Sequence, residues 1–290
     1  MTLPELDAVK GSSENPLENI LNFRDVGETV NAFLGSKIVR EGVLFRSARP
    51  DDASPRDRER LKSEYGIKTV LDLRTKTEHI KSLRNRQSDH LPIQMPGLTY
   101  LSIKLTSRRF ELFLLLQLSL FNILKFLFLF LILNRRVQAL TLIAQHVMRP
   151  RGLLRLGLDT LDRSQPEISA SLRSLITPAF SPLPILIHCT QGKDRTGLIA
   201  ILTLLILDIP LDAISHDYHL TDQALLSEYQ TRLQEVREIG LPDEFANTTP
   251  KLVQHIVAYL NQKYGGLNAY LDRIGFTESH RVKLRESLSY

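Results

Sequence analysis

Short apolar runs and helix-length polar segments alternate along most of the chain. Four apolar runs predict buried strands, over residues 43–47, 67–73, 98–105 and 184–188. Helices are predicted between them, for example from Ser54-Pro55 to Gly66, which are helix start and stop signals, and over the apolar residues 198–207. Because strands and helices interleave, the pattern predicts an α/β fold with a mostly parallel central sheet.

The rest of the pattern predicts one domain over residues 18–290. Residues 1–17 are polar and include Gly11-Ser12-Ser13, so we expect a flexible N-terminal lead-in. Further helices are expected over residues 137–148, ending at Pro150, and over 212–220, 221–239 and 251–264. Residues 157–164 are polar and predict a connector. Gly265-Gly266 supplies a stop signal for the helix over 251–264.

Residues 111–133 stand out because they are apolar over almost the length needed to cross a bilayer. Lys125 near the middle would cost about 2.5–3.5 kcal/mol on insertion scales. At about 100° per residue, the polar residues Gln117, Ser119, Asn122 and Lys125 fall within one arc of about 200°. The pattern predicts one amphipathic helix or two short ones. Three placements stay open: a lid or core packed on protein, a peripheral contact with a membrane surface, and a transmembrane helix.

The chain's single cysteine lies in the run Ile187-His188-Cys189-Thr190-Gln191-Gly192-Lys193-Asp194-Arg195-Thr196-Gly197. This run joins a predicted strand to a predicted helix. Backbone N–H groups at such a helix start lack partners, can converge on an anion and can stabilise a thiolate. The arginine six positions after the cysteine supplies a planar fork for two phosphate oxygens. The pattern predicts a cysteine phosphatase, and its Arg-Thr-Gly tail disfavours a redox enzyme of the rhodanese type.

Composition narrows the class of protein further. The net charge of +5 is spread along the chain without aromatic residues interleaved, which argues against nucleic acid and favours anionic substrates or an anionic membrane face. One cysteine excludes an intramolecular disulfide and suits a reducing compartment, and no secretory signal is visible. We expect a cytoplasmic protein, with membrane association left open. No cluster with metal-ligand spacing is apparent, so neither a metal nor a cofactor is expected.

Several motifs together resemble a tyrosine-phosphatase family that includes the secreted mycobacterial tyrosine/lipid phosphatases and fungal tyrosine/serine phosphatases, with the fungal branch more similar. The resemblance covers nearly everything from Asn22 to the C-terminus. It rests on Asn22-Phe23-Arg24-Asp25, Leu44-Phe45-Arg46-Ser47, Leu71-Asp72-Leu73-Arg74 with Glu78, His188–Gly197, Asp217-Tyr218, Tyr264-Gly265-Gly266 and Tyr270-Leu271. It implies a parallel sheet of four or five strands wrapped by helices, with a helical lid insertion at about residues 108–150.

The cysteine run assigns the chemical roles. Cys189 is expected to attack phosphorus and form a cysteinyl-phosphate that water hydrolyses. Arg195 and the loop amides are expected to hold the phosphoryl oxygens. Thr196 is expected to hydrogen-bond the sulfur and His188 to order the loop. The predicted phosphate-binding residues are Thr190, Gln191, Gly192, Lys193, Asp194 and Arg195.

The general acid and the purpose of the other motif residues are less defined. The resemblance points to Asp194 as the acid. Asp72, at the end of the strand over 67–73, is the other candidate, although it could equally form a salt-bridge network with Arg74 and Glu78. A further set is expected to be architectural, because charged groups near strand ends usually pair: Arg24, Asp25, Arg46 and Ser47.

Three functions remain open from the sequence. The first is hydrolysis of phosphotyrosine, with phosphoserine, phosphothreonine or phosphoinositides as further substrates. The run Lys193-Asp194-Arg195 resembles that of phosphatases acting on phosphoinositides, although Lys193 could instead simply offset the charge of Asp194. The second is an inositol-phosphate or inositol-pyrophosphate phosphatase. The third is a catalytically weak, membrane-associated module that binds phosphate without hydrolysing it, although intact Cys189, Arg195 and Thr196 argue against this.

Overall fold

The centre of the fold is a five-stranded sheet with the strand order β1-β2-β5-β3-β4. The computed structural model describes residues 16–85 and 91–290, so the predicted lead-in lies almost wholly outside the described residues. The strands are β1 (Arg24–Asp25), β2 (Leu44–Ser47), β3 (Thr69–Asp72), β4 (Thr99–Ser102) and β5 (Ile185–His188). β1 pairs antiparallel with β2, and the other pairings are parallel. The predicted α/β class with a mostly parallel sheet is confirmed.

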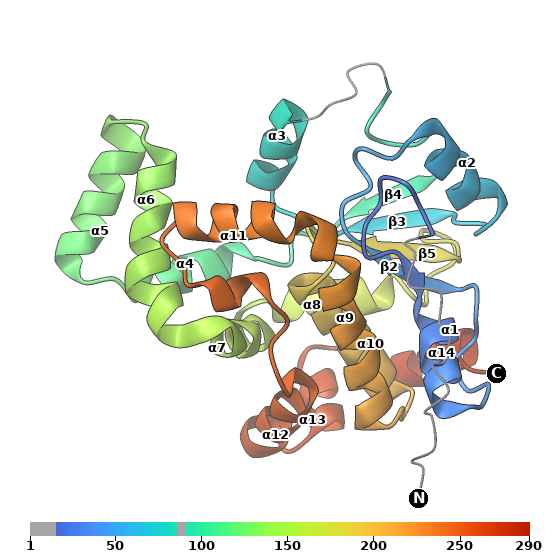
Figure 1. The fold of residues 1–290 in the computed structure, drawn as a ribbon. Coiled ribbons are helices and arrows are strands. Elements are labelled where there is room, and N and C mark those ends of the chain that lie inside the picture. The colour runs from blue at the N-terminus through green and yellow to red at the C-terminus, as the bar shows by residue number, and fades with distance from the viewer. Residues whose placement is uncertain (1–15, 86–90) are drawn as a thin grey trace, which may run out of the picture.

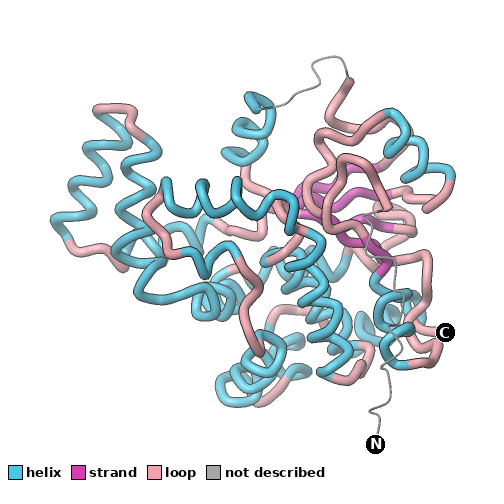
Figure 2. Tube along the Cα trace, in the orientation of Figure 1, coloured by secondary structure: helices cyan, strands magenta, loops and turns pink. Residues whose placement is uncertain are grey.

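Helices make up most of the remaining chain and cover the sheet, as Figures 1 and 2 show. The α-helices are α1 (Val26–Leu34), α2 (Pro55–Ser63), α3 (Lys76–Asn85), α4 (Arg108–Leu116), α5 (Leu120–Leu127), α6 (Arg136–Ile143), α7 (Arg149–Arg163), α8 (Gln165–Arg173), α9 (Asp194–Ile206), α10 (Leu211–Ala224), α11 (Tyr229–Glu238), α12 (Leu252–Tyr264), α13 (Leu267–Arg273) and α14 (Glu278–Leu288). Two π-helical turns (Phe128–Ile132 and Ala144–Met148) and two 3₁₀ turns (Leu226–Glu228 and Asp243–Ala246) join some of them.

The central strand β5 is buried on both faces. Ile185 and Ile187 belong to the larger hydrophobic core, which includes six residues of α9, whereas Leu186 belongs to a smaller core that includes Leu61 of α2. Successive side chains of a strand point to opposite faces. A strand covered on both faces therefore has a continuous apolar sequence, which is why this strand was predictable.

The connector predicted over residues 157–164 is wrong. These residues belong to α7, which has the bounds Arg149 and Arg163 but is kinked at Gly152, whose φ of 70° and ψ of 165° are not helical. The helix predicted over 137–148 ends near Pro150 as expected, because helical backbone continues from α6 through the π-helical turn only as far as this kink. Asp159 is buried and paired with two arginines of the same helix, so a polar residue here belongs to a packed helix rather than to a loop.

A helical insertion joins β4 to β5, as predicted. α4 and α5 are two short helices because Ser119 caps the start of α5 with its side chain. α5, the π-helical turn Phe128–Ile132 and α6 form a hairpin that projects from the molecule on the side opposite α2 (Figure 1). No helix of the described residues is long and apolar enough to cross a membrane.

Candidate active site

The predicted phosphate site lies where three strands end side by side. Ser47 at the end of β2 and Asp72 at the end of β3 are both in register with His188 at the end of β5. Cys189 follows directly and is only 3% exposed, and α9 begins at Asp194. Open parallel sheets place their ligand sites at this carboxyl edge. The topology thus puts the cysteine loop where a substrate would be expected.

The loop directs backbone N–H groups to one side. Asn22 Nδ2 donates to the carbonyl oxygen of Gln191 (3.0 Å) and Arg46 Nη2 donates to that of Gly192 (2.8 Å). In a trans peptide the C=O and the following N–H point in opposite directions. Among the described residues, none of the N–H groups of residues 190–196 donates to a protein acceptor. Free donors at a helix start are able to bind an anion, and we call this set of N–H groups the cradle.

Gly192 makes the tight path of the loop possible. Its φ is +68°, and a Cβ atom there would lie 2.2 Å from the carbonyl oxygen of Ser47. That separation is far below van der Waals contact. Only glycine fits both the conformation and the space, so the loop packs directly on the end of β2.

A buried ionic network supports the loop from beneath. Asp217 on α10 accepts from Arg46 Nη1 (2.5 Å) and from Arg24 Nε (2.8 Å). Burial acts to raise the pKa of Asp217, but the charges of the two arginines hold it well below its ordinary value. Burial, and then the charge of Arg46, lower the pKa of Arg24 to about 10. The two arginines therefore have the architectural role expected for them, and one of them also fixes a loop carbonyl.

Arg195 is held by a carboxylate that the sequence did not assign to the site. Both oxygens of Glu78, on α3, accept from its guanidinium, at 2.7 and 2.5 Å, and the Thr190 hydroxyl donates to the same carboxylate. Burial opposes ionisation of Glu78, but the contact with Arg195 outweighs it and the pKa lies far below its usual range. The only available signal was the place of Glu78 beside the Asp72–Arg74 motif.

The two candidate acids lie in different surroundings. Asp72 is buried and accepts from Arg74 Nη2 at 2.7 Å, and its carboxylate lies 3.4 Å from His188 Nε2. Burial acts to raise its pKa, but His188 and Arg74 outweigh burial and lower it. The side chain of Asp194 is 49% exposed in the first turn of α9. Of the salt-bridge network considered for Asp72, the pair with Arg74 is present, whereas Glu78 pairs with Arg195 instead.

The ammonium group of Lys193 is bound by other parts of the protein. Its Nζ donates to Asp194 Oδ1 (2.9 Å) and to the carbonyl oxygens of Asn247 (2.9 Å) and Phe245 (3.4 Å). The side chain is fully buried. An ammonium has three donors, and all three have acceptors here. Only the backbone N–H of Lys193 remains available to a phosphate.

His188 and Thr196 flank the cradle. The His188 Nδ1 atom lies 3.2 Å from the carbonyl oxygen of Cys189, which ties the ring to the start of the loop. The Thr196 hydroxyl is buried and has no hydrogen-bond partner among the described residues, the sulfur of Cys189 included. Its predicted bond to sulfur stays a prediction. Within the described residues no group of His, Cys and carboxylate side chains could hold a metal ion.

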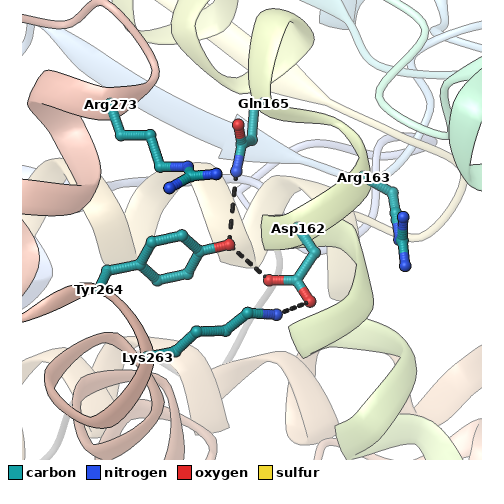
Figure 3. A pocket seen from close by; sticks show the side chains of 6 residues that line it. All are labelled: Asp162, Arg163, Gln165, Lys263, Tyr264 and Arg273. Atoms are coloured by element: carbon teal, nitrogen blue, oxygen red, sulfur yellow. Dashed lines mark hydrogen bonds and ion pairs between the residues drawn. The ribbon is translucent and has the colours of Figure 1, made fainter.

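A second polar pocket lies among α7, α8, α12 and α13 (Figure 3). Its centre is Asp162, which accepts from the Tyr264 hydroxyl (2.6 Å) and from the Lys263 ammonium. Burial and the Asp162 carboxylate raise the pKa of Tyr264 to about 12, so the phenol stays a donor. The hydroxyl of Tyr270 donates to the carbonyl oxygen of Leu161 (2.9 Å). The C-terminal motif tyrosines therefore fasten the end of α7.

The comparisons with known proteins agree with this geometry. A family model described as the tyrosine phosphatase family matches residues 15–290. A tyrosine-protein phosphatase of Nostoc commune is 32% identical over 139 residues, which are 44% of this chain and 46% of that protein. A protein of Cupriavidus necator whose name also contains tyrosine-protein phosphatase is 26% identical over 266 residues, 92% of this chain and 83% of its own length.

The family match and the matching relatives identify a phosphatase, an enzyme class that hydrolyses phosphoric monoesters. The family match covers the sheet, the loop and the helical insertion alike. The chain belongs to the tyrosine phosphatase family, as its motifs predicted.

Proposed function

We propose that the protein hydrolyses phosphomonoesters through a cysteinyl-phosphate. The Cys189 thiolate attacks phosphorus in line, an S–P bond forms, and the ester oxygen leaves with a proton from a general acid. Water then attacks the phosphocysteine, releases inorganic phosphate and restores the thiolate. The observation that supports this most directly is the set of unpartnered N–H groups of residues 190–196 around a buried cysteine, with Arg195 beside them.

The supporting residues have separate roles in this proposal. Arg195, oriented by Glu78, grips two phosphoryl oxygens while the loop amides hold the charge that develops in the transition state. The Thr196 hydroxyl turns to the sulfur and stabilises it as a leaving group in the second step. A buried hydroxyl without a partner costs about 1–3 kcal/mol, which is consistent with a group kept for the reaction.

We assign the general acid to Asp194. It is half-exposed at the rim of the cradle, whereas Asp72 is buried and bonded to Arg74. A proton donor must reach the substrate and exchange its proton with water. The Lys193 ammonium, 2.9 Å from Asp194 Oδ1, positions this carboxyl.

We propose phosphotyrosine as the main substrate, with phosphoserine, phosphothreonine and phosphoinositides as further ones, so that the partner is a phosphorylated protein or lipid. The protein would work in the cytoplasm, where its single cysteine stays reduced, with peripheral membrane contact through residues 111–133. Comparing kcat/KM on phosphopeptides, soluble inositol phosphates and phosphoinositides distinguishes this proposal from the inositol-phosphate alternative. Vanadate binding without phosphate release from any of them would instead identify a phosphate-binding module.

The intermediate can be tested by rapid acid quench. Wild-type enzyme mixed with p-nitrophenyl phosphate should carry one phosphoryl group on the peptide that contains Cys189, detected by mass spectrometry. Thr196→Ala should raise the trapped fraction because it slows the second step. A phosphoryl group on any other residue during turnover would overturn the proposal.

A further inference from the structure

The hairpin of residues 120–140, called here the apolar arm, exposes large apolar side chains to solvent. It comprises α5, the π-helical turn and the first part of α6. These side chains are between 38% and 82% exposed: Leu120, Phe121, Leu124, Leu127, Phe128, Leu131, Ile132, Leu133, Val137 and Leu140. Single exposed apolar residues are ordinary on a protein surface, but a contiguous set of this size marks a contact site.

The spacing shows that these residues form one face of a helix. Seven of them, from residues 120 to 132, follow at intervals of one, three, three, one, three and one, which is the repeat of a helical stripe. Ile123 and Phe126, on the other side of α5, pack against the hydrophobic core at the base of the insertion. An ordinary surface helix turns its apolar side inward and its polar side outward. The arm is apolar on both sides, so its outer side lacks the usual polar cover.

The charges of the arm have one sign. Residues 112–158 contain no Asp or Glu and six Lys or Arg, whereas the whole chain has 32 acidic and 37 basic residues. Lys125, Arg135 and Arg136 belong to the arm and form no ion pair among the described residues. Arg135 and Arg136 lie two positions or more after the exposed Ile132 and Leu133, and with Asn134 they line a shallow hollow. Apolar and cationic groups therefore meet at the same tip.

This combination fits an anionic lipid surface better than a second copy of the chain. In a symmetric dimer through this face, the same cations of both copies would meet without a carboxylate from either arm. A bilayer interface supplies acyl chains for the apolar stripe and negatively charged headgroups for the arginines. Because no described helix can span a membrane, the arm would lie in the interface.

We propose that the apolar arm docks the protein on the surface of an anionic membrane, with Phe121, Leu124 and Phe128 in the acyl boundary and Arg135 and Arg136 on lipid phosphates. This proposal rests on the membrane contact included in the proposed function, and it names the residues and the class of lipid that form that contact. Docking itself needs no catalysis, so it can be measured apart from phosphate release.

The test is co-sedimentation of the full chain with vesicles of phosphatidylcholine alone or mixed with phosphatidylserine. Wild type should bind the mixed vesicles more tightly, and added salt should weaken binding. Arg135→Gln with Arg136→Gln should weaken binding about 30-fold, since each cation near such a surface contributes about fivefold. Phe121→Ser with Leu124→Ser should weaken binding to mixed vesicles by at least about tenfold.

Phe180→Ser is the matched control, because Phe180 is 74% exposed but lies outside the arm. All variants should hydrolyse p-nitrophenyl phosphate like wild type, which shows that they fold and separates this test from that of the reaction. Absence of vesicle binding, or equal loss in the control, would overturn the proposal. The proposal would also be overturned if wild type forms a dimer in solution, does not bind vesicles, and becomes monomeric in the arm variants. That result would identify a second copy of the chain as the partner of the arm.

Discussion

At the scale of single residues, the two aspartates near the loop, Asp72 and Asp194, differ in their ionic partners and in their exposure to solvent. Asp72 is fixed by Arg74 and lies beside His188 under the sheet edge. Asp194 stands at the rim, with Lys193 as its ionic partner. The surroundings of Asp72 keep its carboxylate ionised and in a structural role, whereas those of Asp194 leave its carboxyl group accessible to substrate and water.

We therefore predict that Asp194→Asn lowers kcat about 10²- to 10⁴-fold on substrates with poor leaving groups and abolishes the basic limb of the pH–rate profile. Asp72→Asn should keep that limb and instead destabilise the fold, by up to about 3–5 kcal/mol for a broken buried pair. Activity profiles and urea denaturation of both variants check this. The assignment is wrong if the basic limb survives in Asp194→Asn and disappears in folded Asp72→Asn.

Glu78 gives a second prediction at this scale. Glu78→Gln removes a charge-assisted hydrogen bond from Arg195, and such bonds contribute about 1.5–3 kcal/mol. We expect kcat/KM for p-nitrophenyl phosphate to fall about 10- to 100-fold. Glu111→Gln, which changes an exposed glutamate paired with Lys104, should leave it unchanged. Equal kinetics for the two variants would show that Arg195 does not depend on Glu78.

At the scale of elements, the cysteine loop and β2 are packed so closely that one glycine decides the loop's shape. Gly192→Ala should abolish vanadate binding and phosphate release, because its Cβ would meet the carbonyl of Ser47. Gly35→Ala is the control: its φ is also positive, at +65°, but nothing lies within 4 Å of the new Cβ. That variant should lose only about 1–2 kcal/mol of stability. An active Gly192→Ala enzyme would contradict the loop geometry.

The surroundings of each helix or strand explain whether the sequence could predict it. β5 begins with three consecutive apolar residues and β3 has Val70 and Leu71 in the two different cores, so both are buried on both faces, whereas β1 is only two residues long and gave no signal. The part of α7 after its kink at Gly152 was missed because its polar residues, among them Asp159 and Asp162, resemble those of a loop. The loop residues were predictable because their spacing is local. The bond between Glu78 and Arg195 joins residues far apart in sequence, so only the folded chain reveals it.

At the scale of the molecule, the network of Arg24, Arg46 and Asp217 joins β1, β2 and α10 beneath the loop. The pKa of Asp217 in the folded protein lies well below its ordinary 3.8, because the arginines outweigh burial. At pH values between the pKa of Asp217 in the folded protein and its ordinary pKa, this carboxyl group is protonated in the unfolded chain but not in the folded one. The network thus stabilises the fold fully above the ordinary pKa, and this contribution is lost as pH falls below it.

Asp217→Asn should therefore reduce the free energy of unfolding more at pH 7 than at pH 3. The difference between wild type and variant should shrink by up to about 1.4 kcal/mol for each pH unit below the ordinary pKa. Urea denaturation from pH 3 to pH 7 measures this. A difference that stays constant with pH would show that the carboxylate does not carry the charge assigned to it.

We propose Cys189 as the nucleophile of this phosphatase. The most direct test measures phosphate release from p-nitrophenyl phosphate by wild type and by Cys189→Ser, with vanadate or phosphate binding recorded in parallel. We predict turnover by wild type and none by the serine variant, which should still bind phosphate through Arg195 and the loop amides. Wild-type turnover by a folded Cys189→Ser protein would contradict this proposal.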